Sequence, residues 1–148
     1  MAPLPSRVPP PQASLLPGAR HVLRTPHFIV RADDFLGILI TERTDLPYAS
    51  LQELEDVMDE LCDTLDEQGR ARFALLADLR AAPGRNDSAF ETTMNRLTPR
   101  WCEGFRKVGV LVQTVIGQMQ VQRYARQDGI ERLITTDEAQ LIDYLTAE

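Results

Sequence analysis

The chain has 148 residues, of which 43% are hydrophobic, and this size and composition suit one compact domain with a core of its own. A formal net charge of −6 argues against a nucleic-acid binder, which normally presents a basic face to the phosphates. No apolar run approaches the roughly 20 residues that a membrane span needs. The two cysteines, Cys62 and Cys102, lack metal-ligand spacing and fit a reducing compartment. We expect a cytoplasmic protein without nucleic acid, membrane span, metal or cofactor.

Residues 1–24 are rich in proline, which removes backbone donors, and contain few large apolar side chains. We expect a disordered or extended tail there, followed by a single domain over residues 25–148. Residues 27–31 and 36–42 carry the aromatic and β-branched side chains that are typical of strands. The short turn between these two segments predicts an antiparallel hairpin.

The clearest predicted helix covers residues 48–68. Ser50 and Glu53 have capping-box spacing at its start, and Gly69 can end it. An apolar stripe recurs at helical spacing along one face, formed by Leu51, Leu54, Met58, Leu61 and Leu65. The rest of the helix carries eight acidic residues and no basic one. That face is either a solvated surface or a docking face for a basic partner.

Residues 72–78 form a continuous apolar run, which predicts a third strand in the middle of the sheet. A loop with Pro83 and Gly84 follows. Ser88 and Glu91 again have capping-box spacing and predict the start of a helix. A strand, a loop and a helix N-terminus in this order are a usual place for ligands or partners to dock in an α/β protein.

The remaining chain predicts a short helix over residues 100–104, with Thr98 as its cap and Pro99 in its first turn. Strand, helix, strand and helix follow, over residues 106–113, 114–128, 130–135 and 137–146. Thr135 and Glu138 have capping-box spacing before the last helix. The side chains expected to face inward are Val115, Met119, Val121, Gln122, Tyr124 and Ala125 in the first of these two helices and Ala139, Ile142 and Leu145 in the last.

The predicted order is therefore β-β-α-β-α-β-α-β-α. Strands that alternate with helices indicate an α/β domain whose five-stranded sheet is mostly parallel. The sheet begins with an antiparallel hairpin, and the helices pack on it.

This order, and above all the strand, loop and helix between residues 73 and 94, resembles the STAS domain family. The archetype of that family is the bacterial anti-sigma-factor antagonist, and the chain is more narrowly similar to small bacterial STAS/Sec14-like proteins. The similarity covers about residues 27–145. It is carried by residues 73–80 (FALLADLR), 85–90 (RNDSAF), 107–113 (KVGVLVQ) and 134–145 (ITTDEAQLIDYL). The resemblance implies a non-enzymatic regulatory or scaffolding module that binds another protein.

In that family an aspartate ends the third strand, and a kinase phosphorylates a serine or threonine at the start of the next helix. Phosphorylation controls partner binding in the antagonists. Carried over, the resemblance matches Asp78 to the strand-end aspartate and Ser88, preceded by Asp87, to the phosphoacceptor. The antagonists typically continue with Ser or Thr and then Gly, whereas this chain continues with Ala89 and Phe90.

A phosphate on Ser88 would face free N–H groups and the positive end of the helix dipole. Two interpretations of Ser88 stay open, a helix cap alone or a cap that is also a switch. We predict that a protein partner, such as a kinase or another regulatory protein, binds around residues 80–96. The candidate contact residues are Asp78, Arg80, Arg85, Asn86, Asp87 and Arg96. The arginines Arg80, Arg85, Arg96 and Arg100 are expected to form a basic rim there.

An enzyme is not expected, because no nucleophile elbow, P-loop or GxGxxG motif is present and both histidines fall in or beside the predicted tail. Cys102 is expected to pack rather than to react. The alternative function is a binder of a small apolar ligand or lipid in a Sec14-like cavity. Such a cavity would be lined by Phe28, Phe35, Trp101 and Phe105. A homo-oligomer is left open.

Overall fold

The computed structural model of the chain describes residues 16–147. Within this range six strands and four α-helices alternate after an all-β start, and a short 3₁₀ turn precedes the fourth strand. The elements are β1 (Arg20–Arg24), β2 (Phe28–Asp33), β3 (Ile38–Arg43), α1 (Leu51–Gln68), the turn Arg70–Arg72, β4 (Ala74–Asp78), α2 (Ser88–Cys102), β5 (Val108–Leu111), α3 (Val115–Asp128), β6 (Leu133–Thr135) and α4 (Glu138–Thr146).

The six strands form one sheet in the order of the sequence. β1, β2 and β3 pair antiparallel, and β3 to β6 pair parallel. The predicted α/β class and the antiparallel start are confirmed. The predicted count of five strands is wrong, because β1 pairs along the edge of β2.

The tail predicted for residues 1–24 is therefore wrong in its last part. β1 belongs to the sheet, and Leu16 is buried with Ile38, Leu76 and Leu141. The strand escaped the prediction because its five residues are mostly polar and gain their backbone partners only from β2. Residues 1–15 lie outside the described part of the chain.

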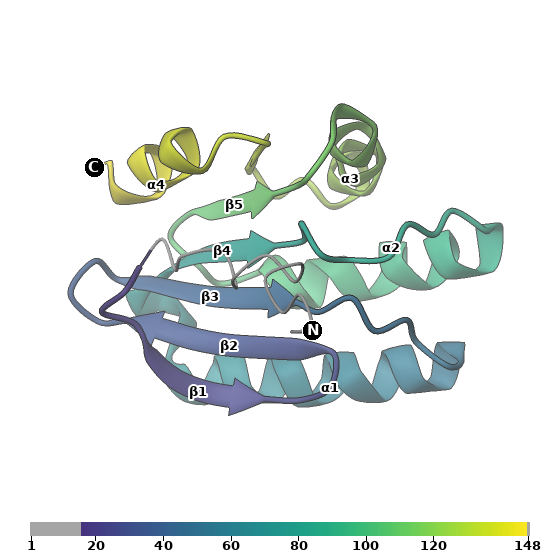
Figure 1. Cartoon of the computed structure of the whole chain (residues 1–148), viewed down its shortest axis with the longest axis horizontal. Helices are drawn as coiled ribbons and strands as arrows, with labels where there is room; N and C mark the ends of the chain where they lie inside the picture. The colour runs from purple at the N-terminus through teal and green to yellow at the C-terminus, as the bar shows by residue number, and fades with distance from the viewer. Residues whose placement is uncertain (1–15, 148) are drawn as a thin grey trace, which may run out of the picture.

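Helices cover both faces of the sheet. α1, α2 and α3 pack on one face, where α1 contributes its buried stripe of Leu54, Met58 and Leu65. Figure 1 shows α1 and α2 behind the strands. α4 packs on the opposite face through Leu141 and Leu145. Three consecutive crossovers thus lie on one side, and the chain changes face only after β6.

Close contact between α4 and β5 requires Gly109. A Cβ atom at this position would come within 2.2 Å of Leu141 Cδ1. Leu145 is buried as predicted, whereas Ala139 is exposed and Leu141 takes the inward position instead. Ile142 is half-buried against the same cluster, so the prediction is wrong for Ala139 only, and it missed Leu141, which packs over the glycine.

The helix caps follow the predicted chemistry at α1 and depart from it at α4. The Ser50 hydroxyl accepts from the Glu53 N–H at 3.0 Å, and the Glu53 carboxylate accepts from the Ala49 N–H at 2.8 Å. The predicted box of Thr135 and Glu138 is wrong. Asp137 caps α4 through the Gln140 N–H, while the Thr135 hydroxyl accepts from the Asp137 N–H.

The short helix predicted after Thr98 is also wrong, because α2 continues through Pro99 to Cys102. Proline removes one backbone hydrogen bond from a helix interior. The Thr98 hydroxyl donates to the Met94 carbonyl at 2.6 Å and so adds a bond at this turn. Trp101 and Cys102 are buried in the core beyond the proline. Their packing carries the helix past the break that the local sequence predicts.

Candidate functional site

The candidate site lies where β4 ends and α2 begins. β4 is buried along its whole length and ends at Asp78. This carboxylate therefore lies at the carboxyl end of the strand, directly after the core residues. A loop of nine residues, 79–87, leads from there to α2. Figure 1 shows the starts of α1 and α2 projecting past the ends of β3 and β4. The loop is therefore framed by the first turns of two helices.

Asp78 and Arg80 form a bidentate ion pair at the base of this loop. Arg80 donates from Nη2 to Asp78 Oδ2 at 2.8 Å and from Nε to Oδ1 at 2.9 Å. The Arg80 backbone N–H also donates to Asp78 Oδ1 at 3.1 Å. A further bond joins Arg80 to Glu138 in the first turn of α4. Arg80 therefore fixes the loop to the start of a helix on the other side of the sheet.

This charge cluster continues across the sheet through residues that the sequence did not single out. Glu42 of β3 is the register neighbour of Asp78 and lies 3.8 Å from the guanidinium of Arg31 on β2. The sequence singled out Glu138 only as half of a capping box and not as a residue of this site. Glu42 carries no local signal, because only strand pairing brings it beside Asp78, and Arg31 reaches Glu42 from the next strand.

Arg85 holds the second half of the loop. Its guanidinium donates from Nε to Asp87 Oδ1 at 2.5 Å and lies 4.9 Å from the centre of the Phe90 ring. The hydrogen bond from Arg85 lowers the pKa of Asp87 below its usual value. The Arg85 carbonyl accepts from Gln120 Nε2 of α3 at 2.6 Å. The loop is thus tied to α3 as well as to α4.

Ser88 is the first residue of α2 and is exposed to solvent. The prediction that Ser88 caps this helix is wrong, because the Asp87 carboxylate accepts from the Phe90 N–H at 3.2 Å. Aspartate and serine are about equally good caps, so the two neighbours could not be ranked from the sequence. Glu91, the other half of the predicted box, pairs instead with Arg123 of α3 at 3.0 Å.

The predicted basic rim does not form as a free positive surface. Arg80 and Arg85 pair with Asp78 and Asp87, as described above. Arg96 pairs with Glu55 at 3.0 Å. Arg100 reaches both Asp59 and Asp63 of α1, at 2.7 and 3.0 Å. The arginines of α2 therefore neutralise part of the acidic face of α1, while Asn86 and Arg96 themselves stay exposed.

The start of α3, next to this loop, presents an apolar surface that the sequence pattern placed inside. Val115, Ile116 and Met119 are 66%, 79% and 59% exposed, which contradicts the predicted inward position of Val115 and Met119. Among the large hydrophobic and aromatic residues of α3, only Tyr124 is buried. α3 covers β6, the edge strand of the sheet. This strand is short and offers little surface on which α3 can bury its side chains.

The four aromatic residues proposed for a ligand cavity do not come together. Phe28 packs edge-on against Trp101 in the core, with ring centres 5.7 Å apart. Phe35 is 95% exposed at the turn between β2 and β3. Phe105 lies under the guanidinium of Arg70. Phe105 also packs against the core cluster that contains Phe28 and Trp101, so only Phe35 lies apart from the other three.

One histidine that the sequence assigned to the edge of the tail is part of the domain. His27 is buried, and its ring stacks on Tyr48 with centres 5.0 Å apart. Its Nε2 lies 3.1 Å from Glu53 Oε1 in the first turn of α1. The His27 side chain therefore links the start of β2 to the start of α1. These contacts explain why it is buried.

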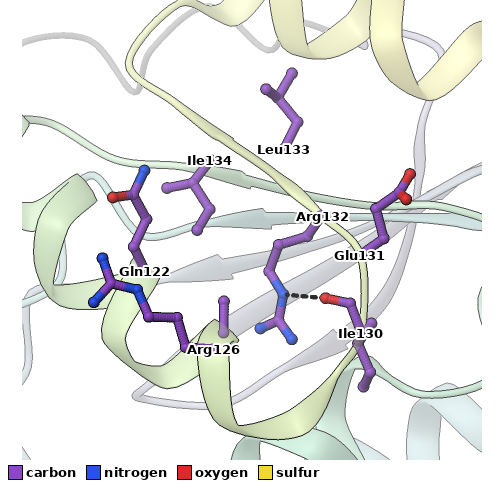
Figure 2. A pocket seen from close by; sticks show the side chains of 8 residues that line it. Gln122, Arg126, Ile130, Glu131, Arg132, Leu133 and Ile134 are labelled. Carbon is purple, nitrogen blue, oxygen red and sulfur yellow. Dashed lines mark hydrogen bonds between the residues drawn. The ribbon is translucent and has the colours of Figure 1, made fainter.

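An open pocket of about 460 Å³ lies between the second half of α3 and residues 130–134. Figure 2 shows Gln122 and Arg126 on one side of it and Arg132, which donates to the Ile130 carbonyl, on the other. None of the predicted contact residues lines this pocket.

Metal-ligating side chains and thiols are the remaining groups of the described residues that could carry chemistry. Among residues 16–147 no three His, Cys, Asp or Glu side chains are placed to hold a metal ion. Burial raises the pKa of Cys102 to about 12, so this thiol stays protonated near neutral pH. In the same residues no helix has both the length and the apolar character required to cross a membrane.

No family model, curated protein or solved structure matches the chain. The similarity to the STAS family thus rests on the residues and the order of elements alone, and it stays a prediction.

Proposed function

We propose that the chain is a non-enzymatic regulatory or scaffolding module of STAS type that acts in the cytoplasm. It binds a protein partner through loop 79–87 and the start of α2, within residues 80–96. Ser88 is its phosphorylation switch. The observation that carries the proposal is an anchored loop that presents four consecutive exposed residues, from Asn86 to Ala89.

The anchors support a binding role because they hold the loop in one conformation before a partner arrives. Arg80 fixes its base to Asp78, and the Gln120 side chain fixes its middle to α3. A surface that is ordered in advance loses little conformational entropy on binding. A partner that contacts residues 86–89 would therefore bind more tightly than it would to the same loop without these anchors.

The position of Ser88 supports a switch for two physical reasons. A phosphate at the first residue of α2 would lie near unpaired backbone N–H groups and the positive end of the helix dipole. It would also compete with Asp87 for Arg85, since the two acidic groups are neighbours and Arg85 now pairs with Asp87. Phosphorylation would change both the charge and the hydrogen bonds of the exposed segment.

The test is an affinity capture from native lysate, followed by mass spectrometry of the bait and its partners. The baits are the full chain, Ser88→Ala and Ser88→Asp, with Thr92→Asp as a matched control because Thr92 is exposed one turn later on α2. An acidic residue in the first helical turn favours the helix, so Ser88→Asp should fold normally.

We expect phosphate on Ser88 and a partner that Ser88→Asp loses and Thr92→Asp keeps. A partner bound equally by all four baits, with Ser88 unmodified, would refute the switch and leave a constitutive scaffold. No specific partner on any bait would refute the interaction module itself.

A further inference from the structure

We infer that the solvent side of α3 is a docking surface for an acidic amphipathic helix of a protein partner. This inference deepens the proposed function and rests on it, since it adds the chemistry of the partner. The surface, called the α3 face here, consists of Val115, Ile116, Met119, Arg123 and Arg126. Its first half is apolar and its second half is basic.

The apolar half is a compact patch on the first two turns of α3. Met119 lies four residues after Val115 and three after Ile116, so it is a neighbour of both on one side of the helix. They account for three of the five large hydrophobic side chains that are exposed in the described residues. Apolar side chains gathered in this way mark interaction sites more often than single exposed ones do.

The basic half continues along the same side of the helix. Met119, Arg123 and Arg126 are spaced four and three residues apart and therefore line up. Arg123 is half-exposed beside Glu91. Arg126 is exposed, and no carboxylate of residues 16–147 lies within ion-pair distance of it. No acidic residue occurs between Val115 and Gln127. Because Glu91 already pairs with Arg123, the charge of the α3 face that is left without an ion-pair partner among residues 16–147 is that of Arg126. This charge favours a carboxylate on the partner, although the chain as a whole is acidic.

The exposed apolar area of the patch is too small to form a stable interface by itself. A side chain of this kind offers on the order of 100 Å² of apolar surface, so three that are between 59% and 79% exposed offer roughly 200 Å². A stable interface buries about 800 Å² on each partner. The partner must therefore cover more than the patch. The adjoining surface is loop 79–87, which Gln120 joins directly to α3.

A second copy of the chain fits this surface less well. An antiparallel pair of α3 helices would set Arg126 of one copy against the positive N-terminal end of the other helix. A parallel pair would set arginine against arginine. A foreign helix with apolar residues at one end and carboxylates at the other satisfies both halves of the α3 face.

The test uses a phage library of random 16-residue peptides selected on the full wild-type chain. Affinities of the enriched peptides are then measured by fluorescence anisotropy for wild type, Ile116→Ser, Met119→Gln and Arg126→Glu. Phe35→Ser is the matched control, because Phe35 is also an apolar side chain, 95% exposed in the turn between β2 and β3. Circular dichroism checks that each variant is folded.

We expect enriched peptides with apolar residues at helical spacing together with Asp or Glu. Their affinity should fall at least tenfold for Ile116→Ser, fall at least threefold for Arg126→Glu, weaken with salt, and stay unchanged for Phe35→Ser. The inference is overturned by peptides that bind all variants equally, by peptides without acidic residues, or by a selection that enriches nothing. It is also overturned by a wild-type dimer that Ile116→Ser dissociates, since the occupant would then be a second copy.

The Ser88→Asp variant separates this inference from the proposed switch. If Ile116→Ser abolishes peptide binding and Ser88→Asp changes neither peptide binding nor lysate capture, the α3 face stands and the switch falls. If Ser88→Asp loses the captured partner and Ile116→Ser keeps both that partner and the peptides, the switch stands and the α3 face falls.

Discussion

Breaking the ion pair between Asp78 and Arg80 should destabilise the protein far more than breaking an ion pair on the helix surface. The two side chains are 11% and 14% exposed and share two hydrogen bonds of 2.8 and 2.9 Å. At an effective dielectric constant of about 20, charges roughly 4 Å apart attract each other by about 4 kcal/mol. Desolvation of both groups offsets part of this attraction. A net coupling of about 2 kcal/mol lies between the values for exposed and for buried pairs.

Urea unfolding of a double-mutant cycle measures this coupling. We expect Asp78→Asn and Arg80→Met each to lower the free energy of unfolding by about 2 kcal/mol. The double variant should lose about 2 kcal/mol less than the sum of the two single variants, because either single change already removes the interaction between the two side chains. The bond from Arg80 to Glu138 is lost in Arg80→Met and in the double variant alike, so it does not enter the coupling. The Asp78 carboxylate keeps one bond in Arg80→Met, from the backbone N–H of residue 80, which limits the loss.

The pair of Arg96 and Glu55 is the matched control, since its side chains are 58% and 38% exposed. Its coupling should stay below about 1 kcal/mol, as for other surface pairs. A coupling for Asp78 and Arg80 that is no larger than this control would refute the reasoning. The loop would then be held by its backbone and by α3, without a contribution from the charge pair at its base.

Two further predictions concern charged groups of different burial. Arg132→Met should lower the free energy of unfolding by about 3 kcal/mol in urea, because it leaves the Asp128 carboxylate buried and unpaired; both side chains are at most 3% exposed. Adding Asp128→Leu should restore most of the lost free energy of unfolding. If it restores none, the loss in Arg132→Met does not come from a buried, unpaired carboxylate. Asp87 has a lowered pKa, so its contribution to stability is complete above about pH 4, near its usual pKa of 3.8, and disappears as the pH falls through the lowered value. Asp87→Asn should therefore flatten the decrease of melting temperature below pH 4, whereas parallel curves for variant and wild type would exclude this contribution.

The local parts of the fold could be predicted from the sequence. α1 has its Ser50 cap and its apolar stripe as expected, because both signals act within one or two helical turns. The continuous apolar run before Asp78 became the fully buried β4. The region of the candidate site followed from the same pattern, since a strand, a loop and a helix start can be recognised without knowing their neighbours. Asp78 and Ser88 were named within this region from the resemblance to the STAS family, and their roles stay predictions.

What the sequence could not supply was the identity of partners far apart in the chain. β1 exists because β2 pairs with it, and no property of five mostly polar residues predicts that pairing. The four arginines looked free in the sequence, yet each meets a carboxylate, and those of Arg96 and Arg100 come from α1, about 40 residues away. Glu138 and Gln120 joined the site only because α4 and α3 pack beside the loop.

The sequence by itself determined most of the helices and strands, because capping and hydrophobic periodicity depend on residues at most a few positions apart. β1 and the continuation of α2 past Pro99 are the exceptions. Tertiary structure decided which side of α3 is covered. The helical pattern placed Val115 and Met119 inside, but α3 lies over the last strand of the sheet, which is only three residues long. There is too little sheet to bury a whole apolar side of a 14-residue helix. Three apolar side chains therefore remain in solvent at the edge of the loop, where a partner can reach them.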